Sequence, residues 1–327
     1  MRLTLSDFEA ITLGASQITE KNGRFLFDRF SREEAAVTDP MALSRCTAGI
    51  RLSFLTDGTL LDLKVHTEEA LPIRSFFSFD ILENGSLIGH IRNFEDGQPA
   101  VYSDISYPLG SFYGQFPLHE GKKQIDILFP HSVVGSIEEL EIAGASFLLP
   151  VKKEKNLLAF GDSITQGFDA LYPSHTYAQR LADHWDMTLV NKGIGGAVFM
   201  PKLAAASQDR ADRIIISYGT NDWNACSRDE FSNNASRFLD VLENRYPNIP
   251  KYVLSPIWRQ DHEDTMPFGP FRLVEKTLRE ICRSYPCVTF LSGWDLVPHN
   301  ADLYADARVH PTDEGFLHFI KNLNKML

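Results

Sequence analysis

Residues 157–167 read LLAFGDSITQG, an apolar run that ends in a glycine-bounded turn carrying one serine, Ser163. A short apolar run before a helix-like segment is typical of a buried strand, and the turn after such a strand lies at the edge of an α/β sheet where ligands bind. A serine hydroxyl is a poor nucleophile until a base takes its proton. Ser163 is therefore a candidate nucleophile if the chain also supplies a histidine and donors for an oxyanion.

The composition limits the classes of function. With 327 residues, 43% of them hydrophobic and 23% charged, the chain is long enough for two folded domains. Its net charge of -11 argues against nucleic acid as a partner, because binding to a polyanion relies on clustered lysine and arginine. No apolar segment is long enough to span a bilayer, and Asp7 and Glu9 stand where a signal peptide needs an apolar core. We expect a cytoplasmic protein without a membrane partner.

The cysteines and glycines do not indicate a metal or cofactor site. The four cysteines are scattered without paired metal-ligand spacing, so free, mostly buried thiols are expected. The glycines of residues 193–196 lack the spacing of a dinucleotide-binding fingerprint. We therefore expect neither a metal nor an organic cofactor.

Up to about residue 150 the sequence has the rhythm of an antiparallel β protein. Turn signals such as Asp57-Gly58 and Asn84-Gly85 connect antiparallel strands in hairpins, and regularly spaced short strands favour a sandwich. We predict an all-β sandwich domain, jelly-roll-like, over residues 1–150. Its clearest strands are expected at residues 50–55, 59–65, 75–82, 86–92 and 124–129.

After residue 150 the pattern changes to alternating strands and helices. This alternation builds a parallel sheet with helices on both faces, and catalytic groups then follow the carboxyl ends of the strands. We predict an α/β domain over residues 151–327. Strands are expected at residues 156–160, 187–191, 213–218, 252–256 and 288–291, and helices at 174–185, 228–245, 269–285 and from 312 onward.

Three further turns carry the groups that Ser163 needs. Residues 191–196 read NKGIGG, and either Gly195 or Gly196 can point a backbone N–H at a ligand. Residues 219–222 read GTND and place Asn221, a neutral donor suited to a developing alkoxide, at the next strand end. Residues 306–311 read DARVHP before the last helix, where His310 is the natural general base.

These four motifs, in this order, resemble the sequence blocks of the SGNH hydrolases, the GDSL-type esterases and lipases. The resemblance covers the second half of the chain and implies a flavodoxin-like, three-layer domain. It implies that Ser163 is the nucleophile and His310 the base. The backbone N–H groups of Ser163 and Gly196 and the amide of Asn221 would form the oxyanion hole.

One position departs from the family pattern. The family carries an aspartate three residues before the catalytic histidine, where this chain has Ala307; Asp306 stands one residue earlier. In one interpretation a one-residue bulge lets Asp306 reach the Nδ1–H of His310 and hold its tautomer. In the other a backbone carbonyl does this and the enzyme works as a Ser-His dyad, as in some carbohydrate esterases.

A β-sandwich ahead of such a domain resembles the layout of certain sugar-ester deacetylases and of a subgroup that includes acyltransferases. The resemblance favours a serine esterase that removes a short acyl group, acetyl in the first instance, from a carbohydrate or another hydroxylated small molecule. An acyltransferase that uses the same acyl-enzyme is the alternative. A second alternative, motivated by Ala307 and by the expected sandwich, is a catalytically impaired glycan-binding protein.

Trp223 follows Asn221 at the same strand end. An aromatic side chain there can line a sugar or acyl pocket, and we expect Trp223 to be a substrate-binding residue; the competing interpretation is packing over the core. Asp162 and Asp222 are expected to bind backbone N–H groups around their turns and to take no chemical role.

Overall fold

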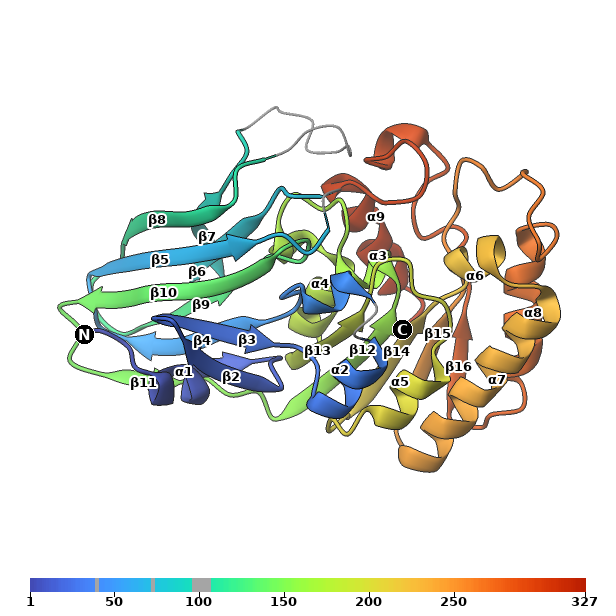
Figure 1. The fold of residues 1–327 in the computed structure, drawn as a ribbon, viewed down its shortest axis with the longest axis horizontal. Coiled ribbons are helices and arrows are strands. Elements are labelled where there is room, and N and C mark those ends of the chain that lie inside the picture. Colours follow the sequence, from blue (N-terminus) through green and yellow to red (C-terminus); the bar gives the residue numbers. More distant parts are fainter. Residues whose placement is uncertain (39–40, 72–73, 96–106) are drawn as a thin grey trace.

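The computed structural model describes residues 1–38, 41–71, 74–95 and 107–327, which form an antiparallel β half followed by an α/β half (Figure 1). The β half consists of two sheets whose inner faces share one apolar core. The first sheet has the order β1-β4-β9-β6-β7, and β11 also pairs with β4. Its strands are β1 (Thr12–Leu13), β4 (Arg51–Thr56), β6 (Ser78–Glu83), β7 (Ser86–Arg92), β9 (Lys123–Leu128) and β11 (Leu148–Pro150).

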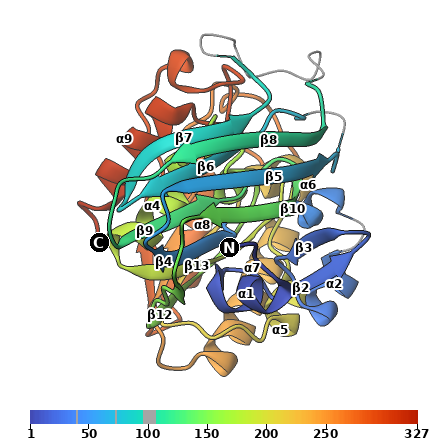
Figure 2. The same ribbon diagram turned by 90° about the vertical axis from the view of Figure 1, so that its left-hand side faces the viewer.

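The second sheet has the order β2-β3-β10-β5-β8 and faces the viewer in part in Figure 2. Alternating side chains of β5, including Leu61, Leu63 and Val65, point into the core shared with the first sheet, as the two-residue period of a half-buried strand requires. Its strands are β2 (Gln17–Lys21), β3 (Arg24–Asp28), β5 (Leu60–Glu68), β8 (Gly110–Pro117) and β10 (Val134–Ala143).

The predicted sandwich is confirmed, and the structure extends it. The turn between β6 and β7 has Asn84 at φ 49° and Gly85 at φ 79°, the two positive values that a tight Asn-Gly hairpin requires. The five expected strands correspond to β4, β5, β6, β7 and β9. The sequence pattern does not predict the remaining strands of this half or two short helices, α1 (Leu5–Ile11) and α2 (Arg32–Thr38), because their apolar periodicity is weak.

The α/β half has a parallel sheet of order β13-β12-β14-β15-β16, which is the doubly wound order of a flavodoxin-like domain. All five expected strands are present, and the first strand along the chain, β12, lies second in the sheet between β13 and β14. The strands are β12 (Lys155–Gly161), β13 (Met187–Gly193), β14 (Arg213–Ser217), β15 (Lys251–Leu254) and β16 (Val288–Leu291).

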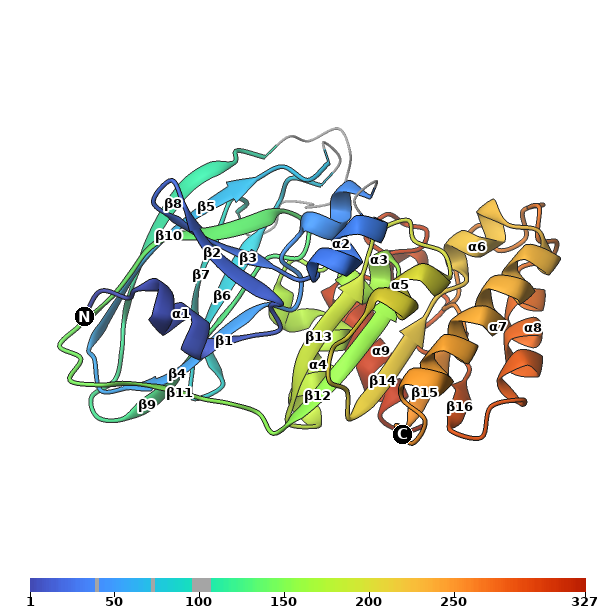
Figure 3. The same cartoon turned by 60° about the horizontal axis from the view of Figure 1, so that its bottom comes forward.

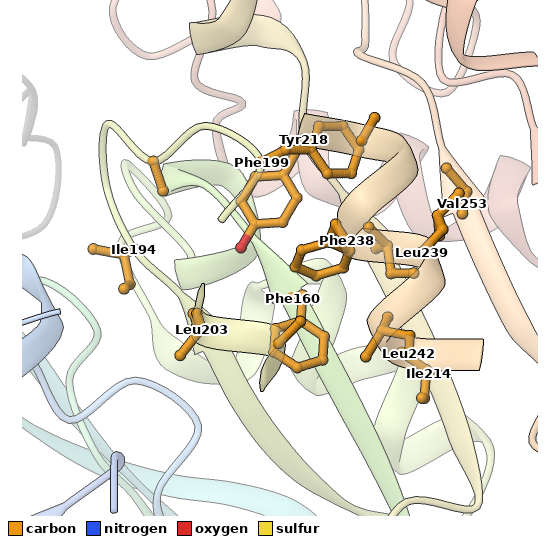
Figure 4. Close-up of a cluster of buried hydrophobic side chains, with 14 of the residues drawn as sticks. Phe160, Ile194, Phe199, Leu203, Ile214, Tyr218, Phe238, Leu239, Leu242 and Val253 are labelled. Atoms are coloured by element: carbon orange, nitrogen blue, oxygen red, sulfur yellow. The ribbon is translucent and has the colours of Figure 1, made fainter. Parts of the chain in front are cut away.

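Helices cover both faces of this sheet (Figure 3). Leu158 and Phe160 of β12 point to one core, which Figure 4 shows with Phe238 and Leu242. Leu157 and Ala159 point to the opposite core. The helices over the first core are α5 (Pro201–Ala206), α7 (Arg228–Arg245) and α8 (Arg272–Cys282), and those over the second are α4 (Tyr177–His184) and α9 (Asp313–Leu323).

Buried charges join the two halves. The guanidinium of Arg29, which follows β3, donates to the carbonyl oxygens of Asn191 at 3.0 Å and Gly193 at 2.9 Å on β13. The ammonium of Lys192 on β13 pairs with Glu34 of α2 at 2.7 Å, and both side chains are buried. Helix α2 also packs on α5 (Figure 3). A division at residue 150 stays a prediction, since residues 29–38 lie against the α/β half.

All four cysteines are free thiols, three of them buried, as expected. Within the described ranges, no helix combines the length and the apolar character needed to cross a membrane.

Candidate active site

The register of the parallel sheet brings the predicted motifs together at one edge. Gly161 on the central strand β12 is aligned with Gly193 of β13 and with Ser217 of β14. Neighbouring strands lie about 4.8 Å apart, so turns that begin after these three residues adjoin one another. Ser163, Gly196 and Asn221 follow the three aligned positions within two to four residues.

Ser163 is the first residue of the short helix α3 (Ser163–Gln166). The side chain of Asp162 caps this helix by accepting a hydrogen bond from the N–H of Ile164 at 3.0 Å. This fixes the strand-to-helix turn and leaves the first-turn N–H of Ser163 unused by the helix. Asp162 is buried, and burial raises the pKa of its carboxyl to about 7. The Asp162 carboxyl therefore stabilises the turn as a helix cap, and this structural contact is enough to account for its burial.

His310 meets Ser163 from the loop before α9. Its Nε2 atom lies 2.8 Å from the Oγ atom of Ser163, a hydrogen-bond distance that suits a base taking the hydroxyl proton. The Ser163 side chain is nearly enclosed, with 5% of the residue exposed. The two residues stand 147 positions apart in the chain, so the fold alone creates this pair.

Asp306 occupies the place behind His310. Its Oδ2 atom lies 2.8 Å from Nδ1 of His310, and its Oδ1 atom accepts the backbone N–H groups of Arg308, Val309 and His310. The loop reaches this geometry because Ala307 takes a left-handed conformation with φ 50°, which inserts the extra residue. Of the two interpretations left open by the sequence, the bulge that brings Asp306 to His310 is the arrangement in the structure.

The surroundings keep Asp306 ionised. Burial opposes its charge, but the hydrogen bond and charge of His310, with the backbone donors of the loop, outweigh burial and hold the pKa of Asp306 well below its usual range. A carboxylate in this position accepts the Nδ1–H of His310 and leaves Nε2 free to face Ser163.

The other two expected oxyanion donors lie in the turns that follow β13 and β14, the strands on either side of β12. Gly196 is exposed and has φ 79°, a conformation that glycine adopts without strain, and open space surrounds the position of a Cβ atom. Asn221 donates one amide hydrogen to the carbonyl oxygen of Ala197 at 3.0 Å, which orients its side chain and leaves the second hydrogen for a ligand.

Asp222 holds the loop that carries Gly196. Its buried carboxylate accepts the N–H of Phe199 at 3.0 Å, and burial raises its pKa to about 6. Gln166 of α3 supports the same loop, since its side-chain oxygen accepts the N–H of Gly195 at 2.8 Å. These contacts tie the turn after β13 to α3 and α6 (Thr220–Ala225).

Trp223 requires a correction. Its side chain is fully buried, and the indole N–H donates to the carbonyl oxygen of Gly269 at 2.7 Å. It packs edge-on against Phe271 and beneath the guanidinium of Arg259. A side chain with no exposed surface cannot line a pocket, so the expected substrate-binding role gives way to packing over the core.

An ion pair that no sequence motif predicts lies beside His310. Asp169, just after α3, lies with Oδ2 3.4 Å from Nδ1 of His310. Arg74 of the β half binds both oxygens of Asp169, with Nε–Oδ1 2.7 Å and Nη2–Oδ2 3.1 Å. No sequence motif marks Arg74, which stands 236 residues from His310 in the chain.

The same cluster does not suit a metal ion. Potential ligand atoms of Asp169, Asp306 and His310 lie within 4.8 Å of one another. However, the guanidinium of Arg74 already binds Asp169, and its Nη2 atom lies 3.3 Å from Nδ1 of His310. A cation placed among these groups would face that positive charge at close range.

Comparison with known proteins agrees with the motifs. The model of the GDSL-like lipase/acylhydrolase family matches residues 159–316, a span that begins in β12 and ends in α9. No curated protein matches the sequence significantly.

Several solved structures share the whole architecture at low sequence identity. The salicylyl-acyltransferase SsfX3 of a tetracycline biosynthetic pathway has a TM-score of 0.81 at 19% identity, over 96% of this chain and 92% of its own. A GDSL-like lipase from Bacteroides ovatus has a TM-score of 0.75 at 17% identity, over 98% and 95%. An acetyl xylan esterase from Butyrivibrio proteoclasticus has a TM-score of 0.63 at 13% identity, over 100% and 97%. These likenesses show a common fold of both halves.

Proposed function

Because residues 159–316 form a GDSL-like lipase/acylhydrolase domain and the chain is thus a carboxylic ester hydrolase, we propose that it is a serine esterase for short acyl groups. The observation that carries this proposal is the line of hydrogen bonds from Ser163 Oγ to His310 Nε2 and from His310 Nδ1 to Asp306, each 2.8 Å long. The acyl group would be acetyl, and the alcohol a carbohydrate or another hydroxylated small molecule.

The proposed reaction runs through an acyl-enzyme. His310 Nε2 takes the hydroxyl proton while Ser163 Oγ bonds to the ester carbonyl carbon. The N–H groups of Ser163 and Gly196 and the amide of Asn221 stabilise the negative oxygen that forms. The bond to the alcohol oxygen then breaks, and His310 returns its proton to the leaving alcohol. Water attacks the acyl-enzyme with His310 again as base, which releases the acid and restores Ser163.

The substrate class is supported by the related architectures. One protein that shares the fold is an acetyl xylan esterase, and another is a family two carbohydrate esterase from Clostridium thermocellum that was solved with cellohexaose. A net charge of -11 is also compatible with a neutral ester rather than a polyanionic substrate.

The direct test combines labelling with turnover. We expect a fluorophosphonate probe to add one covalent group to Ser163, detected by peptide mass spectrometry, and we expect hydrolysis of 4-nitrophenyl acetate and of acetylated xylo-oligosaccharides. Ser163→Ala should abolish both signals, while Ser174→Ala, which alters a serine bonded to Asp80, should keep them. Unlabelled Ser163 in folded protein, or hydrolysis that survives Ser163→Ala, would refute the proposal.

An acyltransferase is the second candidate, and a specific observation favours it. The structure with a TM-score of 0.81 over both halves is an acyltransferase. A transferase would pass the acyl group from Ser163 to an acceptor alcohol before water attacks. Competition of a panel of sugar alcohols and phenols with water, measured as ester product against free acid, distinguishes the two reactions. The contact between Asp306 and His310 supports an active enzyme over the impaired glycan-binding alternative, which hydrolysis of 4-nitrophenyl acetate that is lost in Ser163→Ala would exclude.

A further inference from the structure

We propose that Arg74 of the β half is a positioning residue for His310, which acts by neutralising Asp169 beside the imidazole. The inference rests on the proposed role of His310 as the base for Ser163. It assigns a function in the reaction to the antiparallel half of the chain. The contact that carries it joins three groups from three separate segments: Arg74 between β5 and β6, Asp169 after α3, and His310 before α9.

The guanidinium of Arg74 binds the buried carboxylate of Asp169 in a bidentate geometry. The side chain of Asp169 is 0% exposed, and that of Arg74 is 17% exposed. Two parallel N–H···O bonds from one guanidinium fix both partners in position, which a single bond would not do. The guanidinium also lies over the ring of Phe168, the neighbour of Asp169, at 4.9 Å from its centroid.

The two residues that follow Arg74 are hydrogen-bonded to the β half. The hydroxyl of Ser75 accepts the N–H of Tyr107 at 2.9 Å, and its carbonyl accepts the amide of Asn93 at 2.9 Å. The next residue, Phe76, is buried among aromatic side chains, and its carbonyl accepts the hydroxyl of Ser132 at 2.7 Å. Arg74 is thus presented by an anchored segment, so its guanidinium can define a position.

Charge balance explains why this arginine matters for His310. Two carboxylates face Nδ1, with Asp306 at 2.8 Å and Asp169 at 3.4 Å. One carboxylate orients the imidazole, but two uncompensated ones would favour the charged imidazolium, which cannot take a proton from Ser163. The positive charge of Arg74 cancels that of Asp169 and leaves the net charge of a single aspartate.

Within the part of the chain that the structure describes, the other groups that contact His310 do not provide this compensation. Nε2 faces the neutral hydroxyl of Ser163, and the ring of Phe168 lies 6.0 Å from the imidazole. Asp162 is buried nearby, and its raised pKa of about 7 reduces the negative charge that it carries at neutral pH. Among the described contacts of His310, Arg74 therefore supplies the positive charge.

The test follows the titration of His310 by NMR in ¹⁵N-histidine-labelled protein, with the signal assigned through His310→Gln. Arg74→Gln should raise the titration midpoint by about one pH unit, and Asp169→Asn, which removes a negative charge beside the imidazole, should lower it. The double variant Arg74→Gln/Asp169→Asn should return it close to the wild-type value. Arg74→Lys, which keeps the positive charge but not the bidentate contact, should leave the midpoint nearly unchanged.

Activity gives a second readout. The acid limb of kcat/KM for 4-nitrophenyl acetate should move with the NMR midpoint in each variant, while KM stays nearly constant. Arg51→Gln is the matched control, because the Arg51 side chain is 12% exposed, pairs with Asp126 of the β half and joins the two halves through Asp183. That variant should leave both readouts unchanged.

The outcomes separate this inference from the proposed function. Midpoints of Arg74→Gln and Asp169→Asn that both equal the wild-type value in folded protein would overturn the role of Arg74. If Arg74→Gln does not fold, the downward shift in Asp169→Asn and its reversal in the double variant decide in the same way. Shifts of the predicted sign in a protein that neither hydrolyses esters nor labels at Ser163 would support the electrostatic pairing and refute the esterase.

Discussion

Asp306 and His310 stand four residues apart, and their side chains meet at 2.8 Å because Ala307 between them takes a left-handed conformation. The same carboxylate gathers three backbone N–H groups of the loop through its other oxygen. The loop is closed by an antiparallel bridge between Tyr304 and Pro311. One side chain thus builds the loop and orients the imidazole that the loop carries.

Replacement of Asp306 is expected to impair the reaction more than binding. In Asp306→Asn the amide can hold the loop, but it no longer accepts the Nδ1–H of His310, so a tautomer with the wrong nitrogen protonated becomes accessible. We expect kcat to fall by at least about a hundredfold with little change in KM. Asp302→Asn, at an exposed residue close by, is the control and should behave as wild type. A loss of less than tenfold in Asp306→Asn would mean that another group holds the tautomer.

Asn221 is expected to act only when negative charge develops. Asn221→Ala removes one oxyanion donor and should lower kcat by about 10²–10³-fold while KM stays close to wild type. Asn224→Ala, on the exposed side of the same short helix, is the matched control. Steady-state kinetics on 4-nitrophenyl acetate checks both. An effect of Asn221→Ala confined to KM would instead assign Asn221 to ground-state binding.

The buried carboxyl of Asp162 predicts a pH-dependent stability. Its folded-state pKa of about 7 lies above the unfolded value of about 3.9, so the folded state binds more protons between these values and stability falls as pH rises through that window. Asp162→Asn retains the helix cap without an ionisable group. It should match wild type near pH 4 and be more stable by about 1–3 kcal/mol at pH 8.

Urea unfolding at the two pH values measures this difference. Asp264→Asn, at an exposed carboxylate, is the control and should show no such pH dependence. Equal stability of wild type and Asp162→Asn at pH 8 would contradict the raised pKa.

Trp223 is expected to matter for stability and not for substrate. Trp223→Phe loses the hydrogen bond to Gly269 and part of the buried ring, which should cost about 1–3 kcal/mol of unfolding free energy. The folded variant should keep KM for an ester within about twofold of wild type, because a fully buried side chain does not touch the substrate. Calorimetry and kinetics on the same preparation check both. A large rise in KM without loss of stability would restore the substrate-binding role.

The sequence alone predicted the sheet and three of its strand ends because those signals are local. Gly161, Gly193 and Ser217 each end an apolar run, and the register of the parallel sheet aligns these three residues. This alignment does not depend on contacts with distant parts of the chain. The NG turn after β6 was readable for the same reason, as its two residues carry the positive φ angles themselves. The strands of residues 12–28 were missed because their burial is partial and their alternation weak.

What the sequence by itself determined, then, is which residue types follow β12, β13 and β14, namely a serine, a glycine turn and an amide, and that a histidine precedes the last helix. The tertiary structure alone decided what stands behind His310 and whether Trp223 meets a ligand. The contact of Asp306 with His310 depends on the left-handed backbone conformation of Ala307, and the burial of Trp223 depends on how deeply α6 packs. The contact of Arg74 with Asp169 depends on the packing of one half against the other. Contacts across such distances in the chain are set by packing, which no local pattern of residues encodes.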